Sequence, residues 1–234
     1  MFFLQQIWEN FLDILYPSPE VCLLCRQNPV AKNQICRKCA RELEIWQAGS
    51  ASRNTVYVGK RGKFLSNFYL LYAAAPYKGA FKQAIQNLKY GKKTYLASVL
   101  GEIMALYLQT KAKLVFDLII PVPLTSRKEA QRGFNQAQLL AEVISLKLNI
   151  PLEKGLLVKQ RETKTQVSLK KDKRLQNLKG AFTLSHKISE RPRILLIDDI
   201  FTTGATAKEA VLTLLKGGAD EVTVLVWAKS IAKY

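Results

Sequence analysis

The sequence has few acidic residues and a single histidine. Among its 234 residues, Lys and Arg number 36 and Asp and Glu number 18, which gives a net charge of +18 at pH 7. A positive field of this size attracts phosphate-rich partners such as nucleotides, nucleic acid or an anionic membrane. A solvated basic surface without a partner is the alternative. The lone His186 matches no motif, so we expect an exposed loop residue and not a catalyst.

The sequence also lacks a long apolar run. No stretch approaches about 18 consecutive apolar residues, so it predicts no transmembrane helix. The apolar segment 1–15 has no basic start and no small-residue cleavage site, and it contains Glu9 and Asp13, which argues against a signal peptide. We interpret it as an amphipathic helix that packs on the protein or on a partner, and we expect a cytoplasmic protein.

Only four cysteines are present, and they form two C-x-x-C pairs separated by ten residues: Cys22, Cys25, Cys36 and Cys39. This spacing suits one tetrahedral zinc ion. Two disulfides are unusual in the cytosol, and a redox site needs one pair, so these are the weaker interpretations. Four sulfur ligands leave no open coordination position, which predicts a structural and not a catalytic metal.

The chain has the rhythm of an α/β protein. Short apolar runs at 70–75, 114–120, 156–159, 181–184, 193–197 and 221–227 alternate with helical patterns at 80–88, 96–108, 137–148 and 205–216. Apolar strands that alternate with helices favour a parallel sheet covered on both faces. We therefore expect an N-terminal helix and zinc knuckle at 1–46, a linker at 47–65 and one α/β domain at 66–234.

The most informative segment runs from Arg193 to Thr206. A buried strand ends at two adjacent acids, Asp198 and Asp199, and a loop of small and hydroxyl residues leads into a helix. Ligands of open α/β sheets bind outside the carboxyl ends of strands, and a helix start attracts phosphate. The acids could accept hydrogen bonds from two ribose hydroxyls, and the loop could hold the phosphate through Thr202, Thr203, Gly204, Ala205 and Thr206.

Less specific explanations exist for each part of this segment. Thr206 could cap the helix, Gly204 could be an ordinary turn residue, and one aspartate could bind a metal. Each feature is common alone, whereas their order is not.

The run Leu195–Thr206 resembles the phosphoribosyl pyrophosphate (PRPP) motif of type I phosphoribosyltransferases. Nearly the whole chain resembles the ComF family of competence-associated, phosphoribosyltransferase-like proteins. The blocks that carry this resemblance are the paired cysteine knuckles, Leu88-Lys89-Tyr90, Pro121–Leu124, Arg132–Gln136 and Arg161–Gln166, followed by Arg174, Asn177, Gly180 and Phe182. The implied fold is a type I phosphoribosyltransferase-like parallel sheet flanked by helices.

The resemblance implies where pyrophosphate would bind. The loop Pro121, Val122, Pro123 and Leu124 takes the place of the pyrophosphate loop, although its prolines have no N–H and leave Val122 and Leu124 as backbone donors. Nearby basic side chains could pair with pyrophosphate oxygens: Arg127, Lys128 and Arg132. A solvated basic loop is the alternative.

Residues 161–178 match the flexible hood that closes over the substrate in this class, with Arg161 and Lys164 reaching the pyrophosphate. The wider segment 154–179 carries nine basic and two acidic residues, so it could instead bind a nucleic-acid backbone. The sequence leaves both uses open.

Three functions are compatible with these observations. The resemblance implies a protein of DNA uptake that keeps a pocket for PRPP and Mg²⁺ and binds single-stranded DNA, with competence or recombination proteins as partners. An active phosphoribosyltransferase would use Asp198, Asp199 and Arg161 to transfer ribose 5-phosphate to an acceptor that the sequence does not identify. A PRPP sensor without turnover is the third.

Overall fold

The computed structural model describes residues 20–30, 34–57, 68–111, 115–160 and 180–230. Five strands form the main sheet in the order β1-β2-β7-β6-β3. The strands are β1 (Arg53–Tyr57), β2 (Phe68–Pro76), β3 (Leu118–Pro121), β6 (Arg193–Phe201) and β7 (Glu221–Lys229). Only β1 is antiparallel to its neighbour, while β2, β7, β6 and β3 run parallel. The predicted mixed α/β fold with a parallel sheet is therefore confirmed.

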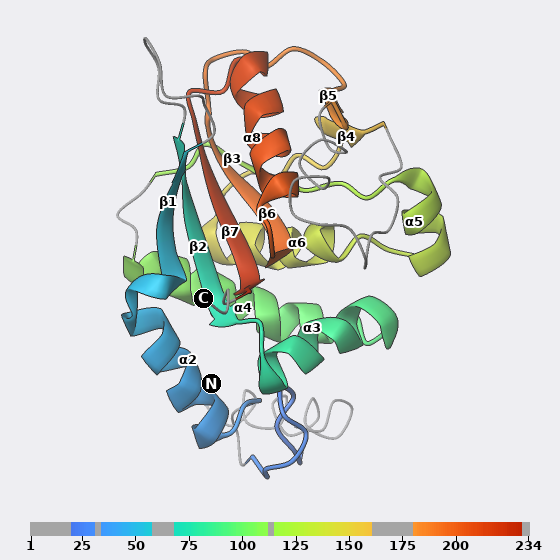
Figure 1. Cartoon of the computed structure of the whole chain (residues 1–234). Coiled ribbons are helices and arrows are strands. Elements are labelled where there is room, and N and C mark those ends of the chain that lie inside the picture. The colour runs from blue at the N-terminus through green and yellow to red at the C-terminus, as the bar shows by residue number, and fades with distance from the viewer. Residues whose placement is uncertain (1–19, 31–33, 58–67, 112–114, 161–179, 231–234) are drawn as a thin grey trace, which may run out of the picture.

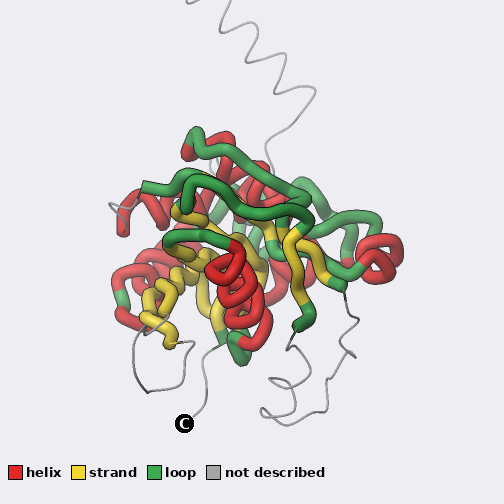
Figure 2. Tube along the Cα trace, turned by 90° about the horizontal axis from the view of Figure 1, so that it is seen from above, coloured by secondary structure: helices red, strands yellow, loops and turns green. Residues whose placement is uncertain are grey.

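Helices cover both faces of the sheet (Figures 1 and 2). The helices α3 (Gly79–Tyr90), α4 (Leu96–Lys111) and α6 (Gln136–Leu148) lie on one face, and α8 (Ala205–Gly217) lies on the other. A small antiparallel pair, β4 (Leu157–Lys159) and β5 (Phe182–Leu184), packs beside α8. Because both faces are covered, successive residues of β6 are buried on opposite sides: Leu195 and Ile197 face α4 and α6, and Ile194 and Leu196 face α8.

The cysteine segment belongs to the same core as the sheet. Helix α2 (Arg37–Ala48) begins within the second C-x-x-C pair, with Cys36 as its N-cap and Cys39 in its first turn, and it packs on β2. Two of its side chains bond to β2: Trp46 Nε1 donates to the Ala73 carbonyl at 2.8 Å and Gln47 Nε2 donates to the Ala74 carbonyl at 3.1 Å. Part of the expected linker 47–65 is thus structured, because residues 53–57 pair with β2 as strand β1.

Two expected elements lie outside the described residues: the helix at 1–15 and the hood at 161–178. A helix that the sequence analysis did not anticipate, α5 (Ser126–Arg132), follows β3. Among the described residues no helix combines the length and the apolar character needed to cross a membrane.

Candidate ribose-phosphate site and cysteine cluster

Strand β6 extends beyond the end of its neighbour β3, and the two aspartates are the first residues of this extension. The paired part of β3 ends at Pro121, opposite Ile197, and β6 continues to Phe201 beside β7. The strand therefore does not end at the acids, as expected, but two residues after Asp199, at Phe201. Asp198 and Asp199 thus lie near the carboxyl end of the parallel strands, where such sheets bind ligands.

The two acids have different surroundings. Asp199 is buried, and its Oδ2 lies 2.7 Å from Nζ of Lys89 at the end of α3. Asp198 is partly buried, and its Oδ1 accepts the backbone N–H of Asp199 at 2.8 Å. Burial and then the neighbouring charge of Asp199 raise the pKa of Asp198 to about 7, although the Asp199 N–H, Lys89 and Lys159 act in the opposite direction.

Lys159 of β4 approaches the acids from the α8 side of the sheet. Its pKa is lowered by burial and by Lys128, and the charge of Asp198 partly offsets this effect. Its Nζ also lies 5.2 Å from the ring centre of Phe182. The acid pair is thus compensated from both faces, by Lys89 on one and Lys159 on the other.

The loop after β6 is shaped by glycine. Gly204 has a φ of 75° and caps the start of α8, and a Cβ on it would lie 2.5 Å from the Phe201 ring. No other residue satisfies both requirements. Thr202 is exposed and Thr203 and Thr206 are partly exposed, while the first N–H groups of α8 have no partner within the helix. This end of α8 offers hydroxyl and amide donors to an anion.

The loop Pro121–Leu124 lies next to the acids, but it offers fewer donors than expected. The Val122 N–H donates to the Ile197 carbonyl at 2.8 Å and so continues the pairing of β3 with β6. Of the two expected backbone donors in this loop, Leu124 is the one that remains. Asn135 fixes the loop: its Nδ2 donates to the Val122 carbonyl at 3.1 Å, and its Oδ1 caps α6 through the Ala137 N–H.

The predicted pyrophosphate cations lie on α5, and Arg161 and Lys164 lie outside the described residues. Lys128 and Arg132 line a cavity with Lys89, so α5 and the end of α3 bring basic side chains next to the acids. Sequence reasoning gave no role to Lys89 or Lys159. Lys89 belongs to a block that the family resemblance already marked, and its role becomes visible only in three dimensions.

The four cysteines come together as their spacing predicts. Their Sγ atoms all lie within 4.8 Å of one another, and the distance from Cys25 Sγ to Cys36 Sγ is 3.8 Å. Zn–S bonds of about 2.3 Å in a tetrahedron place sulfurs about 3.8 Å apart, so the donors fit this geometry. No disulfide joins any of the four in the structure.

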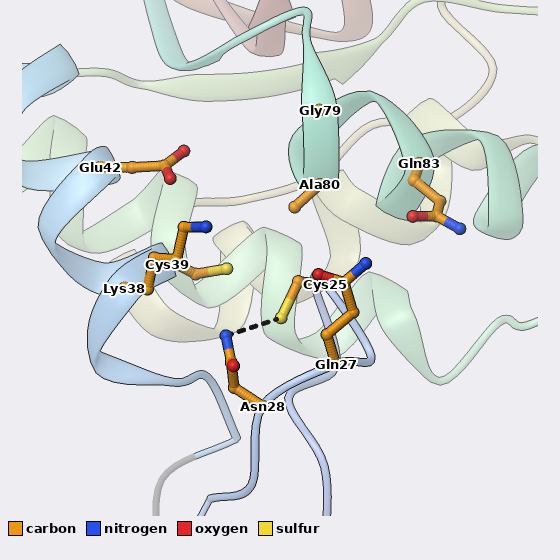
Figure 3. A pocket seen from close by; sticks show the side chains of 9 residues that line it. All are labelled: Cys25, Gln27, Asn28, Lys38, Cys39, Glu42, Gly79, Ala80 and Gln83. Carbon is orange, nitrogen blue, oxygen red and sulfur yellow. Dashed lines mark hydrogen bonds between the residues drawn. The ribbon is translucent and has the colours of Figure 1, made fainter.

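Asn28 supports two of these sulfurs. Its Nδ2 donates to Cys36 Sγ at 3.4 Å and to Cys25 Sγ at 3.7 Å. Burial raises the pKa of Cys36, but N–H donation from Cys39 and Asn28 outweighs it and lowers the pKa to about 6. Asn28 also lines a cavity of about 380 Å³ beside the cluster, shown in Figure 3 with its bond to Cys25.

No family model matches the chain, but curated proteins do. It is 30% identical over 215 residues to Competence protein F of Haemophilus influenzae, which covers 87% of this chain and 94% of that protein. It is 32% identical over 221 residues to DNA utilization protein YhgH of Shigella flexneri (89% and 96%). It is 26% identical over 246 residues to Competence protein ComFC of Bacillus subtilis (97% and 92%).

Similarity to solved structures is weaker. Glutamine phosphoribosylpyrophosphate amidotransferase of B. subtilis aligns with a TM-score of 0.37 and 23% identity, over 55% of this chain and 25% of that one. Adenine phosphoribosyltransferase of Trypanosoma brucei aligns with a TM-score of 0.37 and 16% identity, over 57% of this chain and 52% of that one.

Proposed function

The chain belongs to the ComF family of competence and DNA-utilization proteins, and from this premise we propose that it handles single-stranded DNA and binds PRPP at the Asp198–Thr206 site. One observation carries the proposal for PRPP: two acids at the open end of β6 are followed by a hydroxyl-rich loop and a helix start. Ribose hydroxyls are donors that suit the acids, and a 5′-phosphate is an acceptor that suits the loop.

We assign the proposed roles from the positions of the described residues and, for Arg161 and Lys164, from the family resemblance. Asp198 and Asp199 accept hydrogen bonds from the ribose hydroxyls, and residues 202–206 surround the 5′-phosphate. Leu124 N–H, Arg127, Lys128 and Arg132 take the pyrophosphate, together with Arg161 and Lys164 from the segment 161–179. When bound, Mg²⁺ would neutralise part of the pyrophosphate charge.

The DNA part of the proposal rests on the family names and on charge. The relatives are named for competence or for DNA utilization, and a net charge of +18 favours binding to a phosphate backbone. We propose a cytoplasmic protein with a structural zinc ion in the cysteine cluster, and competence or recombination proteins as its partners.

Binding of PRPP can be tested by calorimetric titration with PRPP and Mg²⁺. We expect Asp198→Asn with Asp199→Asn to lower PRPP affinity at least about 100-fold, because two charge-assisted hydrogen bonds to ribose are weakened. The double variant should remain folded, which circular dichroism checks. Unchanged PRPP affinity in a folded double variant would contradict the site.

The second candidate function is an active phosphoribosyltransferase. It would use the same residues as a protein that only binds PRPP, and it would differ in transferring the ribose 5-phosphate. The acids would hold the ribose while basic side chains stabilise the departing pyrophosphate, so positioning and electrostatics would supply the rate. Release of pyrophosphate with one of a panel of bases or amines would identify this activity. PRPP affinity without release from any of them favours the DNA-handling or sensor function.

A further inference from the structure

A basic cavity lies between the end of α3 and α5, beside the ribose site. Its volume is about 340 Å³, at the lower end of the range of about 300–1,000 Å³ for small-ligand sites. Six residues line it: Lys89, Tyr90, Lys92, Lys128, Gln131 and Arg132. Four of the six are cationic and none is acidic. The cavity therefore suits an anion.

The cations of this cavity are only partly compensated. Lys89 is paired with Asp199, whereas Lys92 and Lys128 form no ion pair with any residue that the structure describes. Like charges gathered around one cavity repel one another, and a bound phosphate would relieve that repulsion.

Tyr90 adds an aromatic surface to the charge. The residue is 73% exposed, although it carries a large ring at the end of a helix. The Arg132 guanidinium lies over this ring, 5.2 Å from its centre, and Arg132 also donates to Gln136. The ring is thus supported by Arg132 and remains open to solvent, as a stacking surface for a base must be.

We infer that this cavity binds one nucleotide of a single DNA strand, with the base stacked on Tyr90 and its phosphate at Lys92, while Lys128 and Arg132 on the α5 side remain with the pyrophosphate. The inference rests on the proposed DNA-handling function for the identity of the ligand. A free mononucleotide has the same chemistry, and the experiment separates the two sources. Lys89 lines the cavity and pairs with Asp199, so the strand would lie directly beside the bound ribose.

The test measures the affinity for a fluorescent oligothymidylate by anisotropy at two salt concentrations. We expect Tyr90→Ala to weaken binding about 5- to 100-fold and Tyr90→Phe to bind like wild type, because stacking needs the ring and not the hydroxyl. Lys92→Gln should weaken binding and reduce the salt dependence by about one phosphate contact. Lys111→Gln, which alters an exposed lysine at the far end of α4, is the matched control and should have little effect.

The PRPP titration separates this inference from the proposed function. Lys92 is not assigned to the PRPP site, so Lys92→Gln should bind PRPP like wild type. Tyr90→Phe keeps the ring under Arg132 and should also bind PRPP like wild type. If wild type binds the oligonucleotide and Tyr90→Ala binds it equally well, the inference is wrong and the DNA-handling function stands. If wild type binds no oligonucleotide at low salt, the DNA function fails, and the inferred strand site fails with it. Binding of thymidine monophosphate alone, lost in Tyr90→Ala, would then identify a free nucleotide as the ligand.

Discussion

The cysteine cluster and the aspartate pair are both concentrations of side chains that can become anionic, and the protein surrounds them differently. The cysteines are close enough for one tetrahedral ion and share a core with Phe81 and Trp227. The aspartates lie at the open end of β6, where Lys89 and Lys159 compensate them from separate elements. Four converging sulfurs suit a structural metal, whereas the acid pair, of which Asp198 stays partly exposed, keeps hydrogen-bonding capacity for a ligand.

This comparison predicts that mutations at the two sites differ in how much they lower stability. Mutation of a cysteine should give the largest loss. Cys39→Ser removes one of the four proposed zinc ligands, and structural zinc contributes about 10–16 kcal/mol in small metal domains. We expect the variant to lose its zinc and to melt at least about 10 °C lower, or not to fold. Scanning calorimetry and metal analysis check this, with about one zinc per chain in wild type.

The control for this prediction is the acid pair itself. Asp198→Asn with Asp199→Asn should lower the melting temperature less than Cys39→Ser, since it keeps the shape of both side chains and leaves only the Lys89 ammonium without its partner. Wild-type protein that contains no zinc when purified without chelator would contradict the metal assignment.

The ion pair between Lys89 and Asp199 gives the second largest expected effect on stability. The side chains of Lys89 and Asp199 are 14% and 7% exposed, so Lys89→Met leaves a buried carboxylate next to a second acid. We expect a loss of about 3–5 kcal/mol in the free energy of unfolding. Adding Asp199→Asn should recover most of this loss, because no uncompensated charge then remains. Urea denaturation of the four proteins in the cycle measures it, and additive effects of the two changes would disprove the coupling.

The pH dependence of stability gives a smaller effect. The pKa of Asp198 is raised to about 7 in the folded protein, mainly by burial, so the folded state holds its proton more tightly than the unfolded chain. This group therefore favours folding at low pH and loses that contribution as the pH rises through about 7. We expect Asp198→Asn to stabilise the protein by about 2 kcal/mol more at pH 8 than at pH 5. Equal stabilisation at both pH values would show that the pKa is not raised.

Much of this structure follows from sequence pattern. The strands at 193–197 and 221–227 and the helices at 80–88 and 205–216 were predicted close to their observed positions, because buried parallel strands are continuous apolar runs. The cysteine cluster also follows from spacing alone.

Other elements could not be read from the sequence for physical reasons. Helix α2 has a polar sequence and buries little more than Cys39 and Leu43, and α5 buries no residue at all. The Lys89–Asp199 pair joins residues 110 positions apart, so only the packing of α3 against the sheet brings them together. The hydrogen bond from the Val122 N–H to the Ile197 carbonyl likewise depends on the register of β3 against β6, which the sequence does not specify.

The central claim is that the acids and the loop beyond them bind one ribose phosphate. A crystal structure of the protein with PRPP and Mg²⁺ tests it most directly. We predict the ribose hydroxyls within hydrogen-bond distance of Asp198 and Asp199, and the 5′-phosphate within reach of the 202–206 amides. PRPP bound at another place would contradict the claim. So would a site at 198–206 that stays empty in crystals soaked with saturating PRPP.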